Sequence, residues 1–169
     1  TITYSRPLAR GRKVFGGLVP FDSLWRTGAS GATTIHITEE IIIGDKTLNA
    51  GKYALFTIPG EKEWTIIINA DTTLHGAFGY DIKKDIHRFK VKSEKAHSFS
   101  EAFTIDLNEI TNKGGGFLNL TWENTAIKIP IKSPVDEKVM AEINTRLIND
   151  KEQNAELFFQ AANYYYTTG

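Results

Sequence analysis

The stretch Y-A-L-F-T-I-P-G-E-K-E-W-T-I-I-I-N, residues 53–69, decides the fold class. Two runs of apolar, aromatic and β-branched residues lie on either side of Pro59-Gly60. This dipeptide is typical of turns, because proline fixes φ and glycine accepts unusual backbone angles. Runs of this length and composition predict buried or alternating β-strands at residues 53–58 and 64–69.

Similar runs recur on both sides of this stretch. They lie at residues 33–38, 40–43, 46–48, 102–107, 117–122 and 126–131, and Gly44-Asp45 predicts a tight hairpin turn. About nine short strands with no helical pattern between them predict a mainly β fold, an antiparallel β-sandwich or jelly roll. We assign it to residues 1–132.

Alternation along two of these runs predicts which side chains face the core. In residues 102–107 it places Phe103, Ile105 and Leu107 on one face of the strand. In residues 117–122 it separates Phe117 from a face formed by Leu118, Leu120 and Trp122. Pro130 cannot donate to a strand ladder, so the last run is expected at an edge or at its end.

A different periodicity begins after Lys132. Ser133-Pro134 predicts a helix start, with the hydroxyl as cap and proline at the first helical position. Apolar residues then recur at three- and four-residue steps in two runs separated by Asn149-Asp150, which predicts an αα-hairpin over residues 133–169. The apolar residues are Val135, Val139, Met140, Ile143, Leu147 and Ile148, then Leu157, Phe158, Ala161, Ala162, Tyr165 and Tyr166.

Composition excludes several classes of protein. The 169 residues carry 20 basic and 20 acidic side chains, so no net charge attracts the chain to nucleic acid or to an anionic membrane. The absence of cysteine excludes thiol catalysis and thiolate metal sites. No apolar stretch is long enough to span a bilayer. The chain begins at Thr1 without an initiator methionine, so we expect that an upstream segment has been removed.

Positive charge is concentrated near the N-terminus. Four of the six arginines lie in the first 26 residues, where Asp22 is the one acidic residue. Guanidinium groups suit carboxylates and phosphates, so we predict an anion-binding pocket. Its predicted residues are Arg6, Arg12 and Arg26, walled by Tyr4 and Trp25. The alternative is that these arginines pair with carboxylates and brace a long N-terminal loop.

A second candidate region is Asp71 to Ile86, where two glycines and several rings lie in a stretch of weak periodicity. Loops of this length inside compact domains are often functional. We therefore consider His75, Phe78 and Tyr80 as a lid over the pocket, with a short surface helix from Tyr80 as the alternative. His36, between two isoleucines of a predicted strand, is a further candidate pocket residue.

Motifs for catalysis and metal binding are missing from the sequence. The four histidines show no metal-ligand spacing, so we predict no metal and no cofactor. No serine lies in a nucleophile elbow, and Gly114-Gly115-Gly116 lacks the lysine of a phosphate loop. Paired carboxylates are sequence neighbours, not groups held across a cleft. Whether the protein is an enzyme is left open by the sequence.

Several stretches resemble a known family. They are Y-S-R-P (4–7), G-R-K-V-F-G-G-L-V-P (11–20), W-R-T-G-A (25–29), A-G-K-Y-A-L-F-T-I-P (50–59), E-W-T-I-I-I-N (63–69) and G-A-F-G-Y-D (76–81). Together they resemble domain-of-unknown-function family 2911 over about residues 4–132. The resemblance implies a polar pair such as Asn-Glu after W-R-T-G-A. This chain has Ser30-Gly31 there instead, so it lacks the acidic side chain of that pair. The family implies no activity.

The resemblance also implies a source and a compartment. Members are secreted or periplasmic proteins of Bacteroidetes-type bacteria with an N-terminal signal sequence, and the helical tail is similar to the start of a tetratricopeptide-like extension. We therefore expect an extracytoplasmic, non-catalytic binding module for a small anionic or saccharide-like ligand. The alternatives are a scaffold whose C-terminal helices dock a protein partner or self-associate, and a hydrolase or lyase with His36 or His75 as base.

Overall fold

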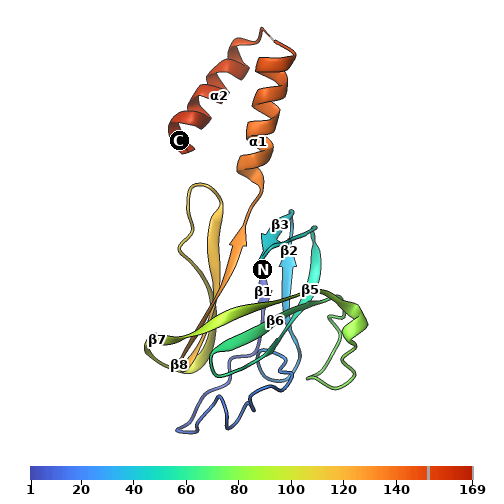
Figure 1. Ribbon diagram of the computed structural model, residues 1–169, viewed down its shortest axis with the longest axis vertical. Helices are drawn as coiled ribbons and strands as arrows, with labels where there is room; N and C mark the ends of the chain where they lie inside the picture. Colours follow the sequence, from blue (N-terminus) through green and yellow to red (C-terminus); the bar gives the residue numbers. More distant parts are fainter. Residues whose placement is uncertain (152, 169) are drawn as a thin grey trace.

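The structure, a computed structural model, describes residues 1–151 and 153–168. Eight strands are followed by a helical hairpin (Figure 1). The strands are β1 (Ile2–Thr3), β2 (Thr33–Ile37), β3 (Ile41–Ile43), β4 (Lys46–Leu48), β5 (Gly51–Ile58), β6 (Glu63–Asn69), β7 (Asp85–Asn108) and β8 (Gly115–Lys132). The helices are a 3-10 turn η1 (Ile82–Lys84), α1 (Val135–Ile143), its π-helical continuation η2 (Asn144–Asn149) and α2 (Ala155–Thr168).

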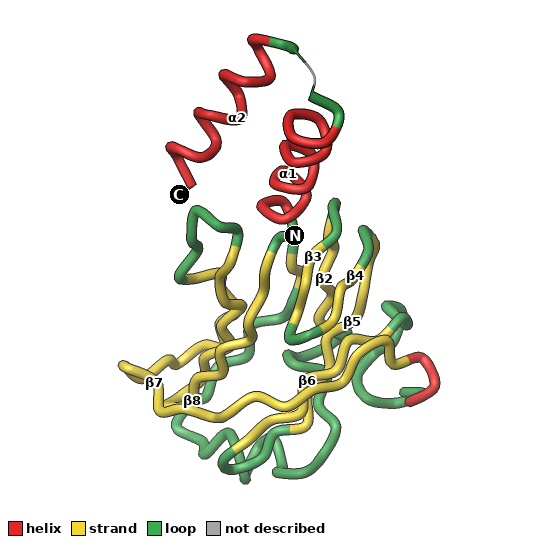
Figure 2. Tube along the Cα trace, turned by 45° about the horizontal axis from the view of Figure 1, so that its top comes forward, coloured by secondary structure: helices red, strands yellow, loops and turns green. Residues whose placement is uncertain are grey.

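All eight strands belong to one antiparallel sheet in the order β1-β2-β5-β6-β7-β8-β3-β4. The long strand β7 serves two neighbours in succession. Its first part pairs with β6, as at Trp64 and Val91, and its second part pairs with β8, as at Ile105 and Leu120. The sheet therefore curves back on itself along β7 (Figure 2).

The N-terminal segment closes this curve. Strand β1 pairs with β2, and the chain then runs to the second half of β7, where Leu8 bridges Ala102. The Phe103 amide donates to the Pro7 carbonyl at 2.9 Å, and the Tyr4 hydroxyl lies within hydrogen-bond distance of the Ile105 amide and carbonyl, at 3.0 and 3.2 Å. The segment thus connects one edge of the sheet to the edge of β7.

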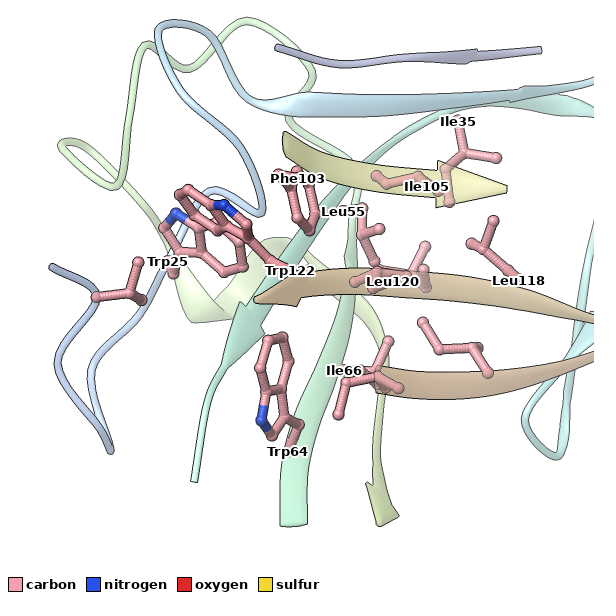
Figure 3. Packing of buried hydrophobic residues seen from close by; sticks show 14 of the residues in the cluster. Trp25, Ile35, Leu55, Trp64, Ile66, Phe103, Ile105, Leu118, Leu120 and Trp122 are labelled. Carbon is pink, nitrogen blue, oxygen red and sulfur yellow. The ribbon is translucent and has the colours of Figure 1, made fainter. Parts of the chain in front are cut away.

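The core lies between the two halves of the curved sheet (Figure 3). Its largest fully buried side chains are Trp64, Trp122 and Phe103, with isoleucines and leucines of β5, β6 and β8, whereas Phe56 belongs to a second, smaller cluster. Trp25 reaches this core from the loop between β1 and β2 and stacks against Trp122, with ring centres 6.0 Å apart. The N-terminal loop therefore contributes directly to the core.

The predicted mainly β, antiparallel domain with a helical segment after it is confirmed. Leu118, Leu120 and Trp122 are buried as alternation predicts, but Leu107 is half-exposed because β7 there approaches the tip of its hairpin with β8. The predicted runs at residues 117–122 and 126–131 are parts of one strand, β8. Pro130 lies in β8 beyond its last pair with β7, where only β3 is a neighbour. The finer sandwich or jelly-roll assignment stays a prediction.

The two helices lie side by side and extend from the end of the sheet opposite the N-terminal loops (Figures 1 and 2). Ile143, Leu157 and Ala161 are buried between them, and the Tyr164 hydroxyl donates to Asp136 Oδ1 at 2.6 Å. The apolar stripes predicted along the two helices are only partly buried, because several of the predicted side chains are exposed. Val135, Ile148, Phe158, Tyr165 and Tyr166 are exposed.

The predicted start of the first helix is wrong by one residue. Pro134 occupies the N-cap position, and no side chain caps the helix. Ser133 instead extends β8, since its amide donates to the Gly114 carbonyl at 2.8 Å. The end of the second helical run at Gly169 lies outside the described residues. The division into residues 1–132 and 133–169 stays a prediction. None of the described helices is long and apolar enough to cross a membrane.

Candidate functional site

A cavity of about 320 Å³ lies under the N-terminal loops. We call it the arginine cavity. It is lined by Pro7, Arg12, Leu18, Val19, Pro20, Ser23, Leu24, Trp25, Arg26, Gly28, Ala29 and Trp122. All of these residues except Trp122 come from the connection between β1 and β2, so this cavity is a property of that loop.

A tight turn at residues 9–12 brings Arg12 to the cavity. Arg10 and Gly11 both have positive φ, 52° and 68°, and the Arg12 amide donates to the Ala9 carbonyl at 3.1 Å. Two positive φ values in succession define a type I′ turn, for which glycine is well suited. The Arg12 guanidinium then donates to the carbonyls of Ala9 and Leu8, both at 2.9 Å. These bonds fix the side chain, and no ion pair with a described carboxylate neutralises its charge.

Trp25 and Arg26 are held by strand β5. The Trp25 amide and carbonyl both bond to Thr57, at 2.8 and 2.9 Å, and the indole Nε1 donates to the Gly28 carbonyl at 3.0 Å. Thr27 follows with a φ of 56°, an outlier for a β-branched residue. Its hydroxyl lies 3.1 Å from that of Thr57, and its carbonyl accepts from the Thr33 hydroxyl at 2.6 Å. Such strain is typical of functional sites.

Arg26 is a cation without a partner. Within the described part of the chain its side chain has no hydrogen-bond partner, its Nε is buried, and no carboxylate lies within ion-pair distance of it. A buried polar group without a hydrogen bond is costly, and a charged one is more so. The alternative of arginines paired with carboxylates therefore does not describe Arg26 or Arg12.

The loop between β6 and β7 backs Arg26. Gly76 is buried with a φ of 84°, and a Cβ added there would lie 3.2 Å from the Arg26 Nη1. The loop is tied to the same region by the Ala32 amide, which donates to the Leu74 carbonyl at 3.0 Å. Gly76 therefore allows the close approach of this loop to the guanidinium.

A polar network fixes the far end of this loop. The Tyr80 hydroxyl donates to the Asp85 carboxylate at 2.6 Å, and Arg88 donates to both the Asp85 carboxylate and the Tyr80 oxygen, at 3.0 and 2.8 Å. The Asn69 amide adds a bond of 2.8 Å to Asp85. Burial, with the Asp85 hydrogen bond next in importance, raises the pKa of Tyr80 to about 12. The loop is thus braced at Tyr80 by these hydrogen bonds.

Three predicted site residues meet at the arginine cavity: Arg12, Trp25 and Arg26. Arg6 and Tyr4 do not line it, because they bond to the second half of β7. Arg6 donates to the Phe103 carbonyl at 3.2 Å and to the Thr104 hydroxyl at 2.9 Å. Both residues hold the N-terminal closure.

The remaining predicted site residues lie apart from the arginine cavity. His36 is exposed on β2, which is on the sheet and not in the loop. His75 is exposed beside Gly76, and Phe78 is 92% exposed, so neither side chain covers the cavity. Tyr80 packs on Phe56 on the outer side of the sheet. The predicted alternative of a short helix near Tyr80 corresponds to η1, whose first amides are capped by Asp81.

Sequence reasoning missed the walls of the cavity. Leu18, Pro20 and Leu24 lie in a stretch without periodicity, where nothing shows which side chains face inward. Trp122 was predicted for the core, and it also lines the cavity, with its indole Nε1 donating to the Glu101 carbonyl at 3.2 Å. Since both indole donors are occupied by carbonyls, the tryptophans offer the cavity carbon surface.

No other described group suggests metal or acid–base chemistry. Among residues 1–151 and 153–168, no three histidine, aspartate or glutamate side chains are grouped as metal ligands. His87 Nε2 lies 2.9 Å from Asp45 Oδ1, but without the alignment of a hydrogen bond, and His87 stacks on Phe89 away from the arginine cavity.

The family described as "Protein of unknown function (DUF2911)" matches residues 1–131. The chain belongs to this family. The match spans all the strands of the sheet except the last residue of β8, and it includes the whole lining of the arginine cavity. No curated protein and no solved structure matches the chain. For this DUF2911 protein, function is therefore argued from the site itself.

Proposed function

We propose that the protein is a non-catalytic binding module for a small ligand with an anionic head and an apolar or sugar-like body. The observation that carries this proposal is the Arg26 guanidinium, half-buried and, among the described residues, without any hydrogen-bond partner. A carboxylate or phosphate would accept two parallel hydrogen bonds from such a group. Arg12 supplies a second positive charge at the same cavity.

The walls of the cavity support an apolar or sugar-like body for the proposed ligand. A volume of about 320 Å³ lies at the lower end of the range for small-molecule sites. Pro7, Leu18, Leu24 and the two tryptophans offer mainly carbon to a ligand. A ring, either aromatic or the apolar face of a sugar acid, would bury this surface while its charge reaches Arg26.

The hydrolase or lyase alternative finds no acid–base group here. Among the described residues that line the cavity there is no histidine, aspartate or glutamate. A general base must lie within hydrogen-bond reach of the proton that it removes, directly or through one water. The geometry therefore favours binding over turnover in the arginine cavity.

A scaffold role for the helical hairpin is the second candidate. Phe158, Phe159, Tyr165 and Tyr166 of α2 are exposed, and aromatic side chains are enriched at protein interfaces. Replacing Phe159 and Tyr166 with serine tests this role. The scaffold role predicts that the variant loses a partner or its self-association in analytical ultracentrifugation. The role is rejected if wild type and variant are both monomers and neither binds a specific partner protein.

The ligand proposal is tested by calorimetric titration with inorganic phosphate, acetate, benzoate and a uronic acid. At least one is expected to bind, and Arg26→Gln should lower its affinity by about tenfold or more, the effect of one charged hydrogen bond. Arg10→Gln is the matched control, since Arg10 belongs to the same loop and does not line the cavity. Equal losses in both variants would show general attraction to positive charge and would refute the site. A periplasmic or secreted location stays a prediction.

A further inference from the structure

A second, smaller cavity lies on the other side of the aromatic cluster. It has a volume of about 190 Å³, and we call it the Trp64 cavity. It is lined by Lys13, Phe15, Phe21, Gly60, Glu61, Trp64, Ser93, Glu123, Asn124 and Thr125. These residues come from the N-terminal loop, the turn between β5 and β6, and strands β6, β7 and β8, and none of them lines the arginine cavity.

Trp64 brings an unused donor to this cavity. The side chain is 1% exposed, and within the described structure its indole Nε1 is buried and has no hydrogen-bond partner. The other two tryptophans, Trp25 and Trp122, donate to backbone carbonyls. Buried indole N–H groups usually find an acceptor, but no described oxygen accepts a hydrogen bond from the Trp64 Nε1, although acceptors line the same cavity.

The polar lining is mixed in sign and in hydrogen-bonding type. Lys13 donates only, whereas Glu61 and Glu123 accept only, and Ser93, Asn124 and Thr125 do both. Glu123 is held in place by a bond of 2.8 Å from the Val14 amide to its Oε2. One cation opposed by two carboxylates does not favour an anion. Alternating donors and acceptors suit the hydroxyl groups of a neutral polyol.

The apolar lining is aromatic and fixed. Phe15 packs on Trp64 with ring centres 4.7 Å apart, and Phe21 is half-buried at the edge of the cavity. Gly16 lies against the Phe21 ring so closely that a Cβ there would be 2.5 Å from it. Phe21 therefore offers a positioned aromatic surface to the C–H face of a ring.

We propose that the Trp64 cavity binds one neutral sugar ring, with the Trp64 indole donating to a hydroxyl oxygen and Phe21 packing on the ring. A cavity of about 190 Å³ lies below the usual range for small-molecule sites, so the proposed ligand is one ring and not a longer saccharide. The proposal does not depend on the anion site, because the two cavities share no residue.

The test follows the indole N–H resonances of the full-length protein by NMR during titration with the methyl glycosides of glucose, galactose, mannose and xylose. The three tryptophans give three such signals, and Trp64→Phe identifies one of them. We expect at least one glycoside to shift the Trp64 signal saturably. Trp64→Phe should weaken binding by roughly tenfold, the loss of one hydrogen bond.

A second variant keeps the test decisive if Trp64→Phe does not fold. Glu123→Gln retains an oxygen for the Val14 amide and removes a carboxylate acceptor, and it should also weaken the glycoside. Arg26→Gln, in the other cavity, should leave glycoside binding unchanged. A Trp64 signal that no glycoside moves would overturn the proposal. A response to zwitterionic glycine in place of the glycosides would overturn it as well.

Discussion

At the scale of the residue, the proposed anion binding depends on the Arg26 guanidinium, which has no hydrogen-bond partner among the described residues. Arg26 is flanked by the strained Thr27 and backed by Gly76 from a distant loop. The clustering of arginines in the sequence predicted one pocket formed by Arg6, Arg12 and Arg26, whereas in the structure only Arg12 and Arg26 of these three line the arginine cavity. The difference lies in the backbone, since the turn at Arg10-Gly11 directs Arg12 toward the cavity while Arg6 lies against β7.

Gly76→Ala tests the backing of Arg26. An alanine at a φ of 84° is strained by about 1 kcal/mol, and its Cβ would press on the Arg26 Nη1 at 3.2 Å. Gly79→Ala is the matched control, because its φ is 79° and its nearest neighbour is Leu74 at 3.6 Å. Both variants should lose similar stability in thermal denaturation. Only Gly76→Ala should change anion affinity in calorimetry, and equal affinities in the two variants would contradict the role given to Gly76.

The raised pKa of Tyr80 predicts that the stability of the protein depends on pH. The pKa of Tyr80 is raised to about 12 in the folded protein, above the ordinary value of 10.0, so the folded state keeps the proton more tightly. The resulting stabilisation is complete below pH 10 and is lost as the pH rises toward 12. The free energy of unfolding, measured with urea, should therefore fall more steeply over this range in the wild type than in Tyr80→Phe. Tyr53→Phe, which removes a hydroxyl bonded to the Asn49 carbonyl, should keep the wild-type slope.

At the scale of the element, the N-terminal segment lies between β2 and the second half of β7 and bonds to both. It pairs with β2 through β1 and with β7 through the bridge between Leu8 and Ala102. The same segment continues into the loop that lines the arginine cavity. Short apolar runs between turn signals were enough to predict most strands. They could not show that β7 extends over 24 residues, because residues 92–101 in its middle are mostly polar and exposed.

Tyr4→Phe tests this closure. The change removes the hydroxyl that meets the Ile105 amide and carbonyl, a loss of about 1–2 kcal/mol for two hydrogen bonds. The melting temperature should fall by roughly 2–8 °C in calorimetry. Because Tyr4 does not line the arginine cavity, ligand affinity at a temperature where the variant is folded should be unchanged. A variant with normal stability and lost affinity would return Tyr4 to the site.

At the scale of the whole molecule, the helical hairpin lies at the opposite end from the N-terminal loops, whose residues line the arginine cavity (Figure 1). Surface ion pairs such as Lys138–Glu40, with N and O 3.1 Å apart, connect the hairpin to the sheet. Exposed pairs of this kind contribute little to stability. The change of periodicity after Lys132 predicted the helical segment, whereas the direction in which the aromatic side chains of α2 face depends on how the two helices pack.

A chain that ends at Ser133 tests the independence of the two parts. It should unfold cooperatively within a few degrees of the full chain, since the core lies wholly within the sheet and the N-terminal loops. Circular dichroism with temperature measures this directly. Aggregation or loss of the cooperative transition would show that the hairpin is needed by the sheet.

The most direct test of the central claim is an NMR titration that follows the Nε–Hε signals of the six arginines. Arg26→Gln identifies the Arg26 signal, and benzoate, acetate and inorganic phosphate serve as probes. We predict that one of them shifts the Arg26 signal saturably, with a smaller shift at Arg12 and none at Arg10. An Arg26 signal that does not move, or that moves no more than that of Arg10, would contradict the assignment of this cavity as an anion-binding site.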